Sequence, residues 1–319
     1  MADFFRSVTS GIARFVSAWL LPVAAGVGLF WAVCITPLAH QRSLRLLTGA
    51  AAGEGHPRGL VIAIAVAISI TLVLSTLLAY GAQVIYRLLE GYHLPRTLSR
   101  KLIARQVRRR RRLQKIVEQG QSSSALKATP AYGIATERLG EFPHDESKTM
   151  PTRLGNALRT MESYGTEVFG LDSQELWYEL VGTARQSVRQ EQEEARALVD
   201  LFIAAVAVAM LLAIGSVAVG LAVQPRGPFV LAGASVVFAH VAYRGSVRNM
   251  KEWRNSVRAL VNLGRADVAD GLGMALPRRL EDEKKMWYAV RGVYLYQDEA
   301  WKPWLDVFRR SQERRHSLP

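Results

Sequence analysis

Four long apolar runs constrain the fold of this 319-residue chain more than any other feature. They occupy residues 19–38, 60–86, 201–223 and 229–243, and neither the second nor the third contains a charged residue. A helix needs roughly 20 apolar residues to cross the core of a bilayer, and uncharged runs of that length are rare outside membranes. The sequence therefore predicts an all-α integral membrane protein with four transmembrane helices.

The basic residues are distributed unevenly around these runs. The chain has 41 Lys and Arg against 27 Asp and Glu, which gives a net charge of +14. Cations gather before the first run and after the second and fourth, whereas the short connection between the third and fourth carries only Arg226. Cytoplasmic loops accumulate Lys and Arg. We therefore expect a multi-pass protein of a cell inner membrane with both termini in the cytoplasm. A cleaved signal peptide is disfavoured, because its candidate site at Ala50–Ala52 lies well beyond the first run.

The remaining segments predict a helical layer on the cytoplasmic side. We expect a C-terminal helical region over 244–311, a disordered tail over 312–319, and a basic helical region over 87–200 that contains a flexible linker or an elaborated loop at 120–150. Within that region, a helix near Ser173–Asp200 should run without a break into the third run. Residues 1–18 have the spacing of an interfacial amphipathic helix, although a simple extension of the first run explains them equally well.

A dense cluster of cations is the sharpest chemical feature. Residues 96–115 include ten basic residues and no acidic one. A juxtamembrane Lys or Arg gains about 1 kcal/mol at an anionic leaflet, so lipid headgroups are the first predicted partner. A nucleotide or oligonucleotide ligand stays open, although the cluster lacks the aromatic residues on which single-stranded bases stack. The candidate binding residues are Arg105, Arg108, Arg109, Arg110, Arg111, Arg112 and Lys115.

The third run is rich in small residues at four-residue spacing, such as Ala205, Ala209 and Ala213. Such patterns let transmembrane helices approach closely, either within one chain or between copies in a homo-oligomer. Ionisable residues inside the runs are scarce. His240, in the fourth run, is the best candidate for a buried polar role, and a hydrogen-bonded packing histidine is the alternative.

No catalytic or cofactor motif is present. The six histidines lack metal-ligand spacing, and Gly271-Leu-Gly273 lacks the third glycine of a dinucleotide-binding loop. The single cysteine, Cys34, excludes an intrachain disulfide and a cysteine metal cluster. We expect no cofactor, no metal and no enzymatic activity.

Three sequence blocks resemble an uncharacterised family of bacterial multi-span membrane proteins. They are Tyr86-Arg-Leu-Leu-Glu-Gly-Tyr92, Pro151-Thr-Arg-Leu-Gly-Asn156 and Ala242-Tyr-Arg244. The resemblance covers about residues 86–287 and implies a topology rather than an activity. It makes the middle block a structured junction whose motif residues are Arg153, Gly155 and Asn156, with Arg153 and Asn156 bonded to backbone or acidic partners.

Two functional hypotheses follow. The first is a homo-oligomeric channel or pore-like effector that the basic region controls, with an anionic ligand as the possible trigger. The second is a membrane scaffold that recruits a soluble protein partner through aromatic side chains near the C-terminus. Those side chains could equally form the core of the C-terminal region; they are Trp287, Tyr294, Tyr296, Trp301 and Trp304.

Overall fold

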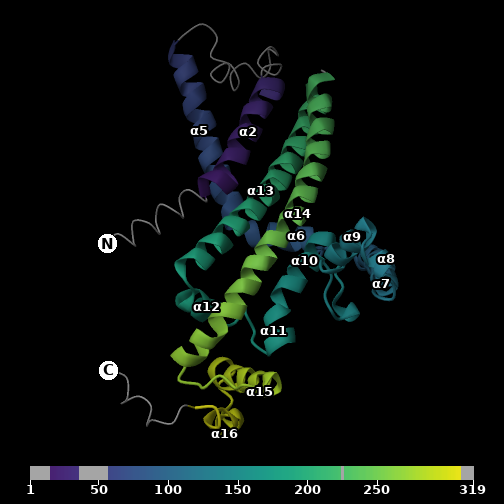
Figure 1. The fold of residues 1–319 in the computed structure, drawn as a ribbon. Coiled ribbons are helices and arrows are strands. Elements are labelled where there is room, and N and C mark those ends of the chain that lie inside the picture. The colour runs from purple at the N-terminus through teal and green to yellow at the C-terminus, as the bar shows by residue number, and fades with distance from the viewer. Residues whose placement is uncertain (1–14, 36–56, 224–225, 310–319) are drawn as a thin grey trace. The chain divides into compact units, whose positions relative to one another are not determined.

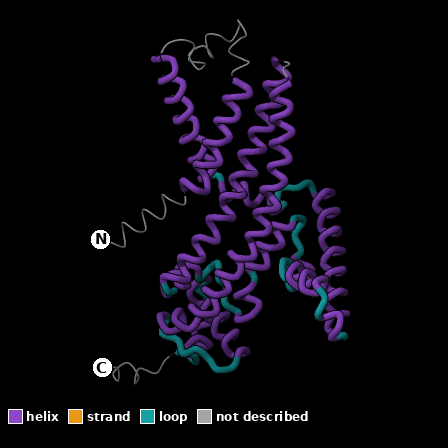
Figure 2. The backbone as a smooth tube through the Cα atoms, turned by 45° about the horizontal axis from the view of Figure 1, so that its top comes forward, coloured by secondary structure: helices purple, strands orange, loops and turns teal. Residues whose placement is uncertain are grey.

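The computed structural model describes residues 15–35, 57–223 and 226–309, and within these ranges the protein is helical with no β-strand. An isolated antiparallel bridge pairs Met274 with Arg309. The predicted all-α fold is confirmed (Figure 2). The chain forms two compact units. We call residues 1–93 and 196–249 the span unit, and residues 94–195 and 250–319 the polar unit.

Four helical segments are long and apolar enough to cross a membrane, in agreement with the four predicted runs. The first, Val16–Ile35, consists of α2 flanked by two short π-helical turns. The segments are labelled in Figure 1 as α2 (Leu21–Phe30), α5 (Pro57–Tyr80), α13 (Gln186–Val223) and α14 (Arg226–Gly271).

The second predicted run is divided at its C-terminal end. Gly81 has a ψ of 4°, outside the helical range, and separates α5 from α6 (Ala82–Glu90). Helix α6 in turn ends at Gly91, whose φ of 95° lies in the left-handed region that glycine adopts without steric cost. The apolar helix therefore stops at Tyr80 rather than at residue 86.

Small residues in the span unit face neighbouring helices of the same chain. A Cβ atom at Gly26 would lie 2.5 Å from Cγ1 of Val208, which places α2 directly against α13. Farther along α13, Gly220 packs against the ring of Phe229 in α14. The buried Cys34 thiol lies 3.6 Å from the hydroxyl oxygen of Ser216. Small residues allow close packing either within one chain or between copies, and these contacts lie within the chain.

Helix α5 contacts its neighbours along one side only, and most of its apolar side chains are exposed. Its hydroxyl groups are nevertheless satisfied. Ser69, Thr71, Ser75 and Thr76 each donate to the carbonyl oxygen four residues earlier, at 2.6 to 2.8 Å. Because these hydroxyls need no water or side-chain partner, α5 presents a surface that hydrocarbon can solvate.

The polar unit is built from short helices together with the ends of α13 and α14 that lie outside the span unit. The predicted linker over 120–150 is wrong, because much of this stretch is helical. Pro130 occupies the first turn of α9, where a missing N–H costs nothing, and the Thr129 hydroxyl caps that helix. Besides the 26-residue α7 (Arg96–Gln121), the short helices are α8 (Ser124–Lys127), α9 (Pro130–Leu139), α10 (Arg153–Glu162), α11 (Tyr164–Phe169), α12 (Trp177–Thr183), α15 (Leu280–Val290) and α16 (Lys302–Asp306).

The helix expected near Ser173–Asp200 is also interrupted. Asp172 accepts hydrogen bonds from the backbone of Gln174 and Glu175, as its capping pattern suggests. Helix α12 then ends at Thr183, and Ala184 is extended before α13 begins at Gln186. Beyond the fourth run, α14 continues without a break to Gly271.

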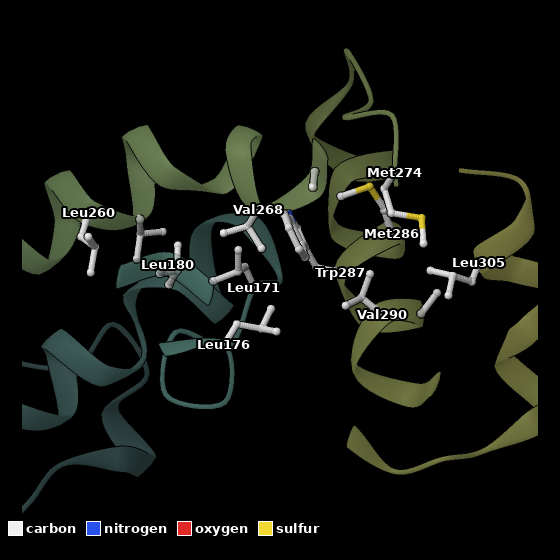
Figure 3. Close-up of a cluster of buried hydrophobic side chains, with 13 residues drawn as sticks. Leu171, Leu176, Leu180, Leu260, Val268, Met274, Met286, Trp287, Val290 and Leu305 are labelled. Carbon is white, nitrogen blue, oxygen red and sulfur yellow. The ribbon is translucent and has the colours of Figure 1, made fainter. Parts of the chain in front are cut away.

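Figure 3 shows the hydrophobic core of the polar unit, where Trp287 of α15 lies beside Val268 of α14, with Met286 and Val290 on its other side. The indole N–H of Trp287 donates to Oε1 of the buried Glu283 at 3.3 Å. Arg265 donates to the same oxygen at 3.0 Å and neutralises the carboxylate. The core therefore takes up Trp287 as a packing residue. The predicted tail over 312–319 and most of the predicted interfacial helix over 1–18 lie outside the described residues.

Candidate anion-binding site

The candidate site lies on α7, which follows Pro95 and carries ten basic residues and a single acid, Glu118. One side of α7 packs against α9. Near its C-terminal end, Gly120 is in such close contact with the ring of Tyr132 that no side chain fits there. This packing fixes which residues of α7 remain exposed.

Three arginines of the run are engaged inside the polar unit. Arg111 donates to Oε1 of Glu146 at 2.6 Å, and Arg110 donates to the carbonyl oxygen of His144 at 2.6 Å. The Arg109 guanidinium lies 5.9 Å from the ring centroid of Phe142, within the range of a cation–π contact. These three predicted ligand-binding residues therefore hold α7 to residues 142–146.

We call the contacts of Arg109, Arg110 and Arg111 with residues 142–146 the clamp. The charges at the clamp match its geometry. The hydrogen bond from Arg111 holds the pKa of the Glu146 carboxyl below its usual range, although partial desolvation opposes the effect. Burial, reinforced by repulsion from Arg153, lowers the pKa of Arg109. At neutral pH the Glu146 carboxylate of the clamp is therefore ionised, and it is shared by the guanidinium groups of Arg110 and Arg111.

Five of the exposed cations of α7 lie in one row, which we call the basic stripe. Their spacing along α7 alternates between four and three residues, so they lie along one side of the helix over a rise of about 21 Å. None of them forms an ion pair with another described residue. The basic stripe consists of Lys101, Arg105, Arg108, Arg112 and Lys115.

Sequence reasoning selected four members of the basic stripe but missed Lys101. The alternating spacing contained the signal, because it places Lys101 in line with Arg105 and Arg108. The dense run Arg108–Arg112 is itself divided, because Arg108 and Arg112 belong to the basic stripe and the three arginines between them belong to the clamp.

The Pro151–Asn156 block, predicted to be a structured junction, forms several contacts within the polar unit. Arg153 pairs with Glu141 at 3.1 Å. The Asn156 amide bonds to both the N–H and the carbonyl of Met150, and it also donates to the Thr152 carbonyl at 2.8 Å. Gly155 donates its N–H to the Thr152 hydroxyl at 3.0 Å. Because α10 is largely buried and these groups bond to one another, the block acts in packing.

His240 is not buried, contrary to the role considered for it. Its neighbours Ala239 and Ala242 face inward on α14, which leaves the imidazole on the exposed side of the helix.

The aromatic residues near the C-terminus do not all belong to one hydrophobic core. Tyr296 and Trp304 are 61% and 62% exposed, whereas the Trp301 ring packs directly on Gly292.

No group of three or more His, Cys, Asp or Glu that could hold a metal ion occurs among the described residues. A scan against protein-family models found no match, and searches of curated proteins and of solved structures found none either. The predicted family resemblance therefore stays a prediction, and the candidate site rests on its own geometry.

Proposed function

We propose that the protein is a membrane effector that conducts ions as a homo-oligomer and responds to an anionic ligand on the basic stripe. In this proposal the polar unit lies in the cytoplasm of a bacterial cell, below the inner membrane. The observation that carries the proposal is the basic stripe itself. Five exposed cations in one row create a local field that attracts anions, and no described acidic side chain pairs with them.

Two unbroken helices support a coupling between ligand and spans. Helix α13 contains both the charged segment around Glu191 and the third apolar run, and α14 contains the fourth run and a charged segment from Arg244 onward. At about 1.5 Å per residue, α14 is about 69 Å long, more than twice the thickness of a bilayer core. A displacement of one end of such a helix is transmitted to the other.

The exposed His240 supports the homo-oligomer. Its neighbours on the same surface, Val237 and Val241, are exposed apolar residues that hydrocarbon can solvate, whereas an imidazole in that position is costly to solvate. A contact between copies would remove His240 from lipid. Gly215 and Gly220 of α13 lend no such support, because Phe30 and Phe229 of the same chain already cover them.

Ion flux through liposomes that contain the purified full-length protein tests the proposal. We expect protein-dependent flux that falls when the whole basic stripe is replaced by Gln. A matched control removes five other exposed cations of the polar unit and should leave the flux unchanged: Lys127, Arg138, Arg185, Arg189 and Arg278, each replaced by Gln. Absence of flux in all lipid compositions would overturn the channel.

The exposed aromatic side chains favour a second candidate, a membrane scaffold for a soluble protein. Tyr296 and Trp304 are large aromatic side chains that are more than half exposed, which is typical of binding surfaces, although the Arg291 guanidinium lies over the Tyr296 ring. The scaffold predicts no flux, together with capture of one identified protein that is lost in Trp304→Ala. The control Leu263→Ala changes an exposed apolar residue elsewhere in the polar unit and should leave that capture unchanged.

A further inference from the structure

We infer that the basic stripe binds the phosphate groups of anionic phospholipids, so that α7 lies along the surface of the bilayer. This inference rests on the proposed function and names its ligand. The chemistry it requires is a row of phosphates, which a lipid surface, a polyphosphate or an oligonucleotide could supply. The shape of the stripe, its aliphatic border and its covalent connection to the spans select the lipid surface.

The shape of the basic stripe fits a flat partner. The half-buried positions Leu102, Gln106 and Leu113 lie along one side of α7, and the five cations of the basic stripe lie on the opposite side of the helix. A plane that touches that side of a straight helix meets all five side chains together. At an anionic leaflet each cation strengthens attachment by roughly fivefold.

Two exposed aliphatic residues border the basic stripe. Leu98 and Ile116 are 44% and 40% exposed, and their separation of five helical turns places them on the same side of α7. At a lipid surface, hydrocarbon lies directly beneath the phosphates, so aliphatic groups beside cations gain contact there. Helix α7 contains no aromatic residue on which the bases of an oligonucleotide could stack.

The covalent connection keeps the basic stripe within reach of a bilayer. Only Gly91–Pro95 separates the end of α6 from the start of α7, and this stretch of chain spans at most about 20 Å. Helix α6 follows the apolar α5 directly. A lipid surface is therefore present at high local concentration, whereas a soluble polyanion has to be supplied from solution.

A fluorescent probe on α7 tests the inference. Ala104 is exposed beside Arg105, and Ala104→Cys in a Cys34→Ala background takes an environment-sensitive label in the full-length protein. The protein is placed in nanodiscs of phosphatidylcholine, with and without phosphatidylglycerol. We expect phosphatidylglycerol to shift the emission of the probe, and high salt to reverse the shift, because exposed charges are screened.

Variants separate charge from folding. Replacement of the basic stripe by Gln should abolish the shift, and the five-residue control variant should retain it. Arg105, Arg108 and Arg112 replaced together by Lys should also retain the shift, because a flat array of phosphates needs positive charge rather than forked hydrogen bonds. Loss of the shift in this Lys variant would contradict the inference.

Two further arms distinguish the source of phosphate. Inorganic polyphosphate or a single-stranded oligonucleotide is added to nanodiscs of phosphatidylcholine alone. A shift that depends on the basic stripe in these arms, with none from phosphatidylglycerol, would overturn the lipid assignment. A lipid-dependent shift in a protein without ion flux would remove the channel and leave the lipid site. Ion flux without a lipid-dependent shift would overturn the lipid site and leave the channel.

Discussion

The hydroxyl group of Tyr86 lies 2.6 Å from Oδ1 of Asp200 and joins α6 to α13 in the span unit. Asp200 is buried, and the guanidinium of Arg196, one turn earlier on α13, lies 3.7 Å from its other carboxylate oxygen. A buried carboxylate is stable only where donors and a positive charge compensate the lost hydration. The Tyr86 hydroxyl is therefore part of what allows Asp200 to occupy this position.

Tyr86→Phe removes one donor from this buried carboxylate. We expect the free energy of unfolding to fall by about 1–3 kcal/mol, as for other buried acceptors that lose a partner. Thermal unfolding of the protein in detergent measures the change. Tyr80→Phe removes a hydroxyl from an exposed tyrosine and should have little effect. Equal effects of the two substitutions would show that the contact with Asp200 contributes nothing.

Gly26→Ala tests the close approach of α2 and α13. The new methyl group would lie 2.5 Å from Val208, and such overpacking costs about 1–3 kcal/mol. Gly28→Ala is the matched control on the same helix, because its new methyl group would meet no neighbouring side chain within 4 Å. Val208→Ala should restore stability to Gly26→Ala. Failure of this rescue in thermal unfolding would contradict the contact.

Gly120→Ala should loosen α7 from α9, because the Tyr132 ring occupies the space that a methyl group needs. Gly133→Ala lies in open space on α9 and should be neutral or slightly stabilising, since alanine favours a helix over glycine. Hydrogen exchange of the α9 backbone measures the difference. Unchanged protection of α9 in Gly120→Ala would mean that Tyr132 moves aside without cost.

Glu162 predicts a dependence of stability on pH. Burial raises the pKa of its carboxyl, with Arg159 opposing the shift and Asp172 adding to it. A carboxyl with a raised pKa in the folded state contributes stability below its ordinary pKa of about 4.3, and loses this contribution as the pH rises through the raised value. Glu162→Gln should therefore increase stability at neutral pH and flatten the profile of thermal midpoint against pH.

Glu191→Gln, at an exposed position, is the control for this substitution. A lower thermal midpoint of Glu162→Gln at neutral pH would contradict the prediction.

The apolar runs could be predicted well, because membrane-spanning helices depend on composition within one segment. The boundary at Gly81 and the helix α9 could not. In the sequence, Pro130 and Gly133 read as helix breakers, yet Pro130 begins α9 and Gly133 lies on its open side. Proline and glycine can end a helix, begin one or lie within one. The contacts of the neighbouring segments decide which of these occurs.

The division of the arginine run shows the same limit. Composition alone treats Arg108, Arg110 and Arg112 as equivalent. The contacts of Arg110 with His144 and Glu146 come from residues more than 30 positions later, so no local pattern reveals them. Helical spacing did contain the basic stripe, since the separation of Lys101, Arg105 and Arg108 is visible in the sequence.

The brief connection between α13 and α14 has a consequence for biosynthesis. Only two residues separate Val223 from Arg226, so the third and fourth runs enter the membrane as one hairpin. Two runs that cross a membrane with so short a connection return the chain to the side from which it started, so the polar segments at both ends of the hairpin lie on one side. A second charge added to the connection between the two runs, which already carries Arg226, would therefore raise the free-energy cost of translocating the whole hairpin during synthesis, before any folded contact exists.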